Sequence, residues 1–235
     1  MILEIDDIEI DVRKKSIKNM HLYVQPPTGR VEVSVPDSVG DEAIQLFIRS
    51  NLGWVKRKRE QFEKQLRQTE RQYISGETMY VFGSQYFLEV IENDANKQSL
   101  TLDGQKAILS VKKNATIKTK EKIVQEWYRN LLKEEIERIL PKWEKITKLK
   151  CDSWQIKKMH TKWGSCNKET KKLWFNLQLA KKTLPCLEYV ILHELIHLKE
   201  PHHNNKFIAL MDLYMPLWSE IRNDLNEQIL DPWEL

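Results

Sequence analysis

Apolar and polar residues alternate along two stretches of the N-terminal half, Ile17–Val24 and Val31–Val35. Alternation with a period of two is typical of strands that bury one face, and the linking segment QPPTGR contains the proline and glycine of a turn. The pattern therefore predicts a β-hairpin. After Pro36 and Asp37 the apolar spacing becomes that of a helix, which we expect to run from about Asp41 to Tyr73.

A second β-rich group follows this helix. The stretches TMYVFG and QYFLEVIE flank Gly83-Ser84, and the stretches SLTL and AILSV flank Asp103-Gly104. The Asp-Gly dipeptide is among the strongest short signals for a tight turn between two strands. We therefore expect strands on both sides of each dipeptide.

The C-terminal half has mainly helical spacing. Apolar residues from about Lys118 to Lys148 recur every three or four positions, and Pro141 is the expected place of a kink. Beyond this helix the pattern predicts two short strands and three helices, near Ser153–His160, Leu173–Asn176, Leu184–Lys199, Asn204–Tyr214 and Leu217–Leu230. This order of elements predicts an α+β fold.

We expect this fold to have two parts. Residues 1–115 are predicted to form a β-rich N-terminal subdomain with one long helix, and residues 116–235 a mainly helical subdomain with a small sheet. The sequence contains no internal repeat, no low-complexity tract and no flexible linker rich in glycine. All 235 residues are therefore expected to belong to folded structure.

Composition narrows the class of protein. The 38 basic and 34 acidic residues give a net charge of only +4, which is weak support for nucleic-acid binding. The three cysteines form no CxxC pair and are expected to be free thiols in a reducing compartment. The chain has no apolar run long enough for a membrane span, and its acidic N-terminus does not resemble a secretory signal. These features predict a cytoplasmic protein without membrane contact.

Imidazole and carboxyl groups stand inside one of the most apolar runs of the chain, EYVILHELIHLKEPHH. Burying such groups is costly unless they are paired, hydrogen-bonded or bound to a metal. His193 and His197 are four residues apart, so on a helix they share one face and can bind the same metal ion. A catalytic zinc ion takes three protein ligands and a water, and Glu194 is placed to act as the base for that water.

The third ligand is expected to come from beyond the helix. Pro201 disfavours helical geometry in the residue before it, so the chain is predicted to turn back and bring His203 within reach. The resulting pattern, HExxHxxxxxH, predicts one zinc ion per chain. His202 and Glu220, the latter starting an ExxxD pattern, are alternatives for the third ligand. A closed structural zinc site with Cys166 as fourth ligand and a metal-free pair of core histidines are further alternatives.

Several segments together are similar to a known family. The segments KMHTKWGSC, FNLQLA and LEYVILHELIHLKEPHHNNKF, with VEVSVP and GETMYVFGSQYFLEV before them, resemble the YgjP-like metallopeptidase domain family, a relative of the SprT-like zincins. The resemblance extends over roughly residues 10–230. It departs at His202 and Ile208, where the family often has Asn and Trp.

The resemblance implies a zincin-like C-terminal half and a zinc-dependent hydrolase. His193, His197 and His203 match the metal positions of the family, and Glu194 matches its catalytic acid/base. We therefore expect a metallopeptidase that attacks a peptide or protein substrate with a metal-bound water activated by Glu194. The WGSC segment fits a strand or turn beside the active-site helix, as in zincins where an edge strand pairs with substrate backbone, and the alternative is that Trp163 and Cys166 are ordinary core residues. His160, Lys162 and Tyr214 are candidate oxyanion stabilisers.

Two other functions remain open from the sequence. A metal-dependent nucleoside triphosphate pyrophosphatase, an activity also attached to the family, would need cationic phosphate contacts. The lysines near the WGSC segment could supply them, namely Lys157, Lys158, Lys162, Lys171 and Lys172. A nucleic-acid-binding module with structural zinc would use the basic segment 54–72, although its glutamates favour an ordinary solvated helix face.

Overall fold

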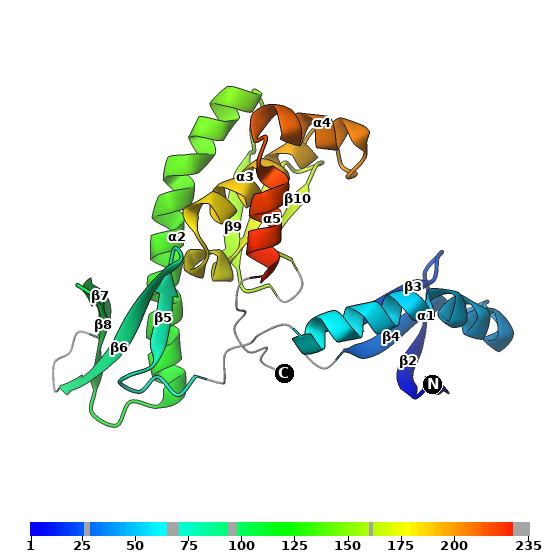
Figure 1. Ribbon diagram of the computed structural model, residues 1–235, viewed down its shortest axis with the longest axis horizontal. Coiled ribbons are helices and arrows are strands. Elements are labelled where there is room, and N and C mark those ends of the chain that lie inside the picture. The colour runs from blue at the N-terminus through cyan, green and yellow to red at the C-terminus, as the bar shows by residue number, and fades with distance from the viewer. Residues whose placement is uncertain (26–28, 65–70, 94–97, 160–161, 228–235) are drawn as a thin grey trace. The chain divides into compact units, whose positions relative to one another are not determined.

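The structure is a computed structural model that describes residues 1–25, 29–64, 71–93, 98–159 and 162–227 (Figure 1). These residues fall into two compact units, the described part of Met1–Glu70 and that of Arg71–Gln228. Five α-helices and three sheets make up the described chain, so the predicted α+β class is confirmed. None of the helices in these ranges has the length and apolar composition to cross a membrane.

The first unit is a four-stranded sheet with one helix. The sheet has the order β1-β2-β4-β3, in which β2 and β4 are parallel and the other pairs antiparallel. Its core consists of every second residue of the strands and of residues three or four apart on helix α1, because each element buries one face. The elements are β1 (Ile2–Ile5), β2 (Ile8–Lys15), β3 (His21–Gln25), β4 (Arg30–Pro36) and α1 (Asp41–Lys64).

The N-terminal hairpin is confirmed, with β3 and β4 as its strands, although the first strand begins at His21 rather than Ile17. Strands β1 and β2 were not predicted, even though Ile8, Ile10 and Val12 alternate with polar residues. The predicted extension of the helix to Tyr73 is wrong, because Tyr73 lies outside the helix with a positive φ. Part of that extension lies outside the described residues.

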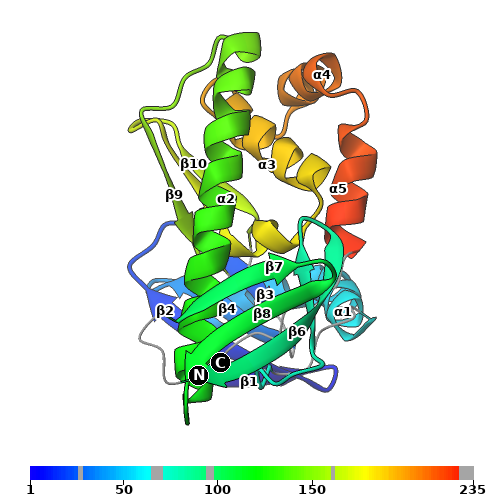
Figure 2. The same cartoon turned by 90° about the vertical axis from the view of Figure 1, so that its left-hand side faces the viewer.

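The second unit begins with another four-stranded sheet and a long helix (Figure 2). The order is β5-β6-β8-β7, with β6 and β8 parallel. Helix α2 continues through Pro141 and starts at a Thr116 cap, whose side chain accepts a hydrogen bond from the backbone of Thr119. The elements are β5 (Thr78–Val81), β6 (Ser84–Asn93), β7 (Ser99–Asp103), β8 (Lys106–Lys112) and α2 (Ile117–Thr147).

The two sheets repeat one topology that the sequence did not reveal. In each, four strands are followed by a helix, the strand order is first-second-fourth-third, and the second and fourth strands are parallel. The first turn of each copy has positive φ at two residues, Asp6-Asp7 and Phe82-Gly83. The predicted turn at Asp103-Gly104 is confirmed between β7 and β8.

The rest of the second unit holds a three-stranded sheet and the C-terminal helices. The sheet order is β10-β11-β9, which leaves β10 at an edge. Both predicted strands and all three predicted helices are present, and the WGSC segment leads into β10. The elements are β9 (Ser153–Lys157), β10 (Gly164–Asn167), β11 (Lys172–Asn176), the 3-10 helix η1 (Leu177–Lys181), α3 (Leu184–His197), α4 (Asn205–Tyr214) and α5 (Trp218–Glu227).

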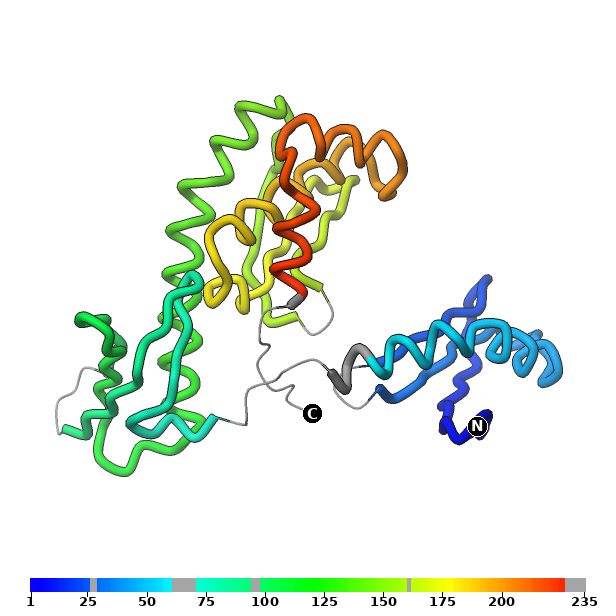
Figure 3. The backbone as a smooth tube through the Cα atoms, in the orientation of Figure 1, coloured from blue at the N-terminus to red at the C-terminus, as the bar shows by residue number. Residues whose placement is uncertain are grey.

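One continuous core runs through the second unit. It joins strand residues such as Leu88 and Leu109 to Leu132 and Ile136 of α2 and to Leu192 of α3. The backbone trace in Figure 3 shows α2 extending along both the sheet and the C-terminal helices. The compact units therefore divide after residue 70, because the second sheet packs with the C-terminal elements. The subdomain boundary had been predicted at 115/116.

Candidate metal centre

Helix α3 carries the candidate site and is buried on most of its surface. It starts at Leu184-Pro185, where proline suits the first helical turn because the backbone amides there have no helical acceptor. His193 and His197 are half-buried on this helix, and Glu194 is 5% exposed. The helix thus holds three polar side chains within the core of the second unit.

The loop after α3 returns the chain to the same face. The backbone amides of Lys199 and Glu200 both donate to the carbonyl of Ile196, which ends the helix. Asn204 then caps α4 by accepting from two backbone amides, and its side-chain amide donates to Glu200 Oε2 at 2.9 Å. These contacts fix the position of His203 between the two helices.

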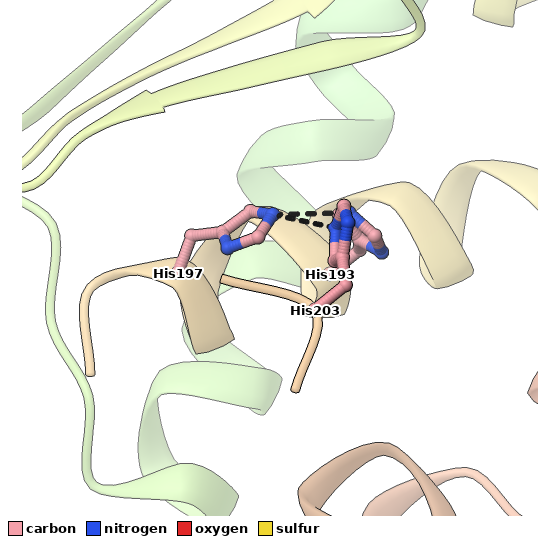
Figure 4. Close-up of side chains that lie close together, drawn as sticks. All are labelled: His193, His197 and His203. Carbon is pink, nitrogen blue, oxygen red and sulfur yellow. Dashed lines mark hydrogen bonds between the residues drawn. The ribbon is translucent and has the colours of Figure 1, made fainter. Parts of the chain in front are cut away.

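The three histidines point their Nε2 atoms toward one another (Figure 4). The Nε2–Nε2 distances are 3.2 Å for His193–His197, 3.0 Å for His193–His203 and 3.1 Å for His197–His203. Three nitrogens bound to one tetrahedral zinc at about 2.0–2.1 Å would lie roughly 3.3–3.4 Å apart. The observed triangle is therefore close to the size that a zinc ion requires.

Hydrogen bonds on the other ring nitrogens orient two of these imidazoles. His197 Nδ1 is 3.0 Å from the carbonyl oxygen of Glu200, which can only accept, so the proton is on Nδ1 and Nε2 keeps its lone pair. Tyr189 Oη is 3.4 Å from His193 Nδ1 and can accept in the same sense. Lone pairs that converge without a proton between them favour a bound cation.

Packing keeps the ligand cluster neutral and close together. The Phe207 ring is buried, and its centroid lies 4.8–4.9 Å from those of all three imidazoles. Burial, followed by the nearby charges of His197 and His203, lowers the pKa of His193 to about 3. Burial also lowers the pKa of His197. Both imidazoles are thus uncharged at neutral pH, the form that binds metals through the nitrogen without a proton.

Glu194 is buried beside β10. Its Oε2 has no hydrogen-bond partner among the described residues, and burial raises its pKa to about 8, while the charge of Lys162 opposes this shift. A Cβ atom on Gly164 would lie 2.6 Å from Glu194 Oε1 and 2.7 Å from its Cγ, closer than real contacts permit. Glycine at the start of β10 therefore leaves the space that the carboxyl group occupies.

These groups border one pocket of about 460 Å³. Its lining comes from β10 with the residues before it, from α3, from the His203 loop and from α5. The charged side chains of the lining are Lys162, Lys168, Arg222 and Glu194. The candidate ligands and the buried carboxyl group thus face a solvent-accessible space large enough for part of a substrate.

The alternatives for the metal ligands lie elsewhere. His202 is exposed, and Glu220 is exposed on α5 outside the pocket lining. The ligand atoms of His193, His197 and His203 all lie within 4.8 Å of one another, and no other donor of the described residues belongs to this group. Cys166 lines the pocket but is outside this group, and burial raises its pKa to about 11. All three cysteines are free, as predicted.

The predicted accessory residues are only partly in place. Lys162 lines the pocket, Tyr214 does not, and His160 lies outside the described residues. Of the five candidate phosphate-binding lysines, the other four are absent from the lining; Lys158 pairs with Glu121, and Lys157 and Lys172 lie over the Trp174 ring.

Three residues at the site were not identified from the sequence, Tyr189, Phe207 and Arg222, and Gly164 was expected near it only as part of the WGSC segment. Tyr189 carried the clearest signal, because it precedes His193 by one helical turn and so shares its face. Phe207 and Arg222 reach the site from α4 and α5, and the residue spacing within the histidine motif does not predict such contacts.

Comparison with known proteins matches residues 18–228 to the family model described as YgjP-like, metallopeptidase domain. Among solved structures, the chain is similar to the metallopeptidase zymogen jannalysin of Methanocaldococcus jannaschii, at 29% sequence identity. That match covers 40% of this chain and 92% of the other, with a TM-score of 0.33. No curated protein matches the chain.

Proposed function

Because the chain belongs to the YgjP-like metallopeptidase domain family, we propose that it is a zinc-dependent peptidase with His193, His197 and His203 as metal ligands and Glu194 as general base. One observation carries this proposal: three imidazole Nε2 atoms converge within 3.0–3.2 Å beside a buried carboxyl group that faces the same pocket. A peptide or protein is the proposed substrate.

The donor set fits zinc in both chemistry and number. Three neutral imidazoles are a ligand set of catalytic zinc sites, and such sites keep one further position for water or substrate. When bound, zinc supplies a Lewis acid that polarises the scissile carbonyl and makes water acidic enough to lose its proton near pH 7. No fourth side-chain donor joins the histidines among the described residues, which favours a catalytic over a closed structural site.

Glu194 is proposed to move the proton. Its carboxylate accepts the proton of the attacking water and then donates it to the nitrogen of the leaving amine, so the group ends each turnover as it began. Burial favours the uncharged carboxylic acid, while the positive charge of Lys162 favours the carboxylate. This balance suits a group that must both take up and release a proton.

Strand β10 offers a backbone surface for the substrate. It is an edge strand whose paired side faces β11, and its residues Gly164, Ser165 and Cys166 line the pocket. An extended peptide can add to such an edge through main-chain hydrogen bonds, which recognise any sequence. A peptide bound along this edge would have its backbone in the pocket that the histidines and Glu194 also line.

Nucleotide hydrolysis is less well supported by the same geometry. Of the five lysines considered for phosphate binding only Lys162 borders the pocket, and the other cationic side chains of the lining are Lys168, which donates to the Lys199 carbonyl, and Arg222. The pocket residues that precede α3 also include no glycine-rich phosphate loop. The peptide substrate is therefore the better fit.

A direct assay tests the proposal. The protein is purified, loaded with zinc or stripped by a chelator, and both samples are assayed against a mixed peptide library and a panel of nucleoside triphosphates. We expect peptide cleavage that requires zinc and no nucleotide hydrolysis. Zinc-dependent nucleotide hydrolysis without peptide cleavage would contradict the proposed substrate class.

A further inference from the structure

Arg222 is a cationic side chain of the pocket that neither the metal site nor the proposed proton transfer uses. It lies on α5, whose residues Leu225 and Asn226 also line the pocket. Three cationic side chains and one carboxyl group are the charged members of the lining, and that carboxyl group is Glu194. The pocket therefore attracts anionic groups before any metal is considered.

Among these cations, neither Arg222 nor Lys162 makes an ion pair with a carboxylate of the described residues. Lys168 Nζ donates to the backbone carbonyl of Lys199 at 3.3 Å. Burial raises the pKa of Glu194, and the charge of Lys162 opposes this rise. No carboxylate of the described residues lies within ion-pair distance of Arg222, although a guanidinium can bind a carboxylate through two parallel hydrogen bonds.

A stack of rings holds Arg222 on the side of the pocket next to His193. The guanidinium carbon lies 5.1 Å from the centroid of the Trp218 ring. Trp218 stacks on Tyr189 at an interplanar angle of 8°, and its indole nitrogen donates to Asp212 Oδ1 at 2.6 Å. Tyr189 in turn contacts His193.

We propose that Arg222 is a specificity-determining residue that binds a carboxylate of the peptide substrate beside the metal centre. The carboxylate belongs either to an acidic side chain or to the C-terminus of the peptide. Trp218 holds the guanidinium by its face, which leaves the N–H groups at its edge for the carboxylate. This inference rests on the proposed peptidase function and deepens it, since it names the class of peptide that the site prefers.

Binding to a zinc-loaded Glu194→Gln protein tests the inference separately from catalysis. Three sets of labelled peptides of one parent sequence are compared by fluorescence anisotropy. One is neutral with an amidated C-terminus, one has a free C-terminal carboxylate, and one is amidated with a single Gln→Glu change at each position in turn. We expect one of the two carboxylate sets to bind about 10-fold more tightly than the neutral peptide.

The same measurements are made on Arg222→Gln in the Glu194→Gln background. This substitution should abolish the preference, so that the carboxylate peptides and the neutral peptide bind with about equal affinity. Arg222→Lys keeps the charge but loses the paired geometry, so it should retain part of the preference. Arg138→Gln is the matched control, because Arg138 is exposed on α2, pairs with Glu135 and lies outside the pocket lining. Melting temperatures of all variants identify any loss of folding.

The set that shows the preference identifies the source of the carboxylate. Equal binding of all peptides, or a preference that Arg222→Gln leaves intact in a folded protein, would overturn the inference. ATP binding is measured with the same variants. Binding of ATP that depends on Arg222, without any preference among the peptides, would also overturn the inference, because the ligand would then be a phosphate. Peptide cleavage by the unsubstituted enzyme is measured in parallel, so failure of the peptidase function is recognised independently.

Discussion

His193 and His197 are brought together by helical spacing alone, whereas His203 depends on a loop. Residues four apart on α3 share one face, so the first pair follows from local structure. The return of His203 depends on the loop after α3, which ends at His197 and is followed by Glu200-Pro201, and on the Asn204 cap of α4. The prediction of the cluster used the helical spacing and Pro201, whereas the Asn204 cap is a further signal that it did not use.

Zinc content of single variants tests the ligand set. Replacement of His193 or His197 by Ala should abolish tight zinc binding, and His203→Ala should weaken it at least about 10-fold, because each removes one of three nitrogen ligands. His202→Ala and Glu220→Ala are controls, since both residues are exposed outside the donor cluster. Loss of zinc in Glu220→Ala with retention in His203→Ala would show a carboxylate-ligand site instead.

Gly164 gives a second test at the level of single residues. Its alanine variant should keep zinc, because the histidines are unchanged, but lose about 10²-fold in turnover as the methyl group displaces the Glu194 carboxyl. Gly40→Ala is the matched control, because nothing lies within 4 Å of the Cβ position there. Turnover of Gly164→Ala equal to that of Gly40→Ala would refute the positioning role.

Among the elements, α3 was predicted well and the N-terminal strands poorly. Helix α3 carries a strong local pattern and a proline near its start and another after its end. Strand β1 has a half-exposed and exposed pattern, so its pairing with β2 depends on contacts that the sequence pattern does not report. The repeated four-strand-and-helix topology was missed for the same reason, because the strand order and directions recur without a recurring sequence.

The burial of α3 predicts how strongly it supports the fold. Leu187 is 0% exposed on this helix, so Leu187→Ala should lower the free energy of unfolding by about 2–5 kcal/mol. Leu213→Ala on α4 should have a small effect, since Leu213 is 69% exposed. Urea unfolding is measured with chelator present, so that zinc binding does not mask the difference. Equal losses in both variants would contradict the described packing.

At the scale of the whole molecule, the chain has two hydrophobic cores with separate membership. One consists of residues from the first sheet and α1, and the other joins the second sheet, α2 and the C-terminal helices. The sequence predicted the fold class and the mainly helical C-terminal end, but it separated the second sheet from the elements on which it packs. Side chains such as Arg222 and Phe207 reach the metal centre only through this packing.

Separate cores predict that the second unit is stable alone. A fragment of residues 71–228 should unfold cooperatively and bind about one zinc per chain, because both the core and the three histidines lie within it. Thermal unfolding and zinc content of the fragment are compared with those of the full chain. A fragment that is unfolded or binds no zinc would show that the first unit is required for the metal centre.

The central claim is that the histidine cluster and Glu194 together form a hydrolytic centre, and it is tested most directly on the Glu194→Gln variant. Zinc content and peptide turnover are measured on the same sample of this variant. Because Gln keeps the size of the side chain but cannot accept the proton, we predict retained zinc and a loss of turnover of about 10²–10⁴-fold. Retained zinc with unchanged turnover would contradict the account.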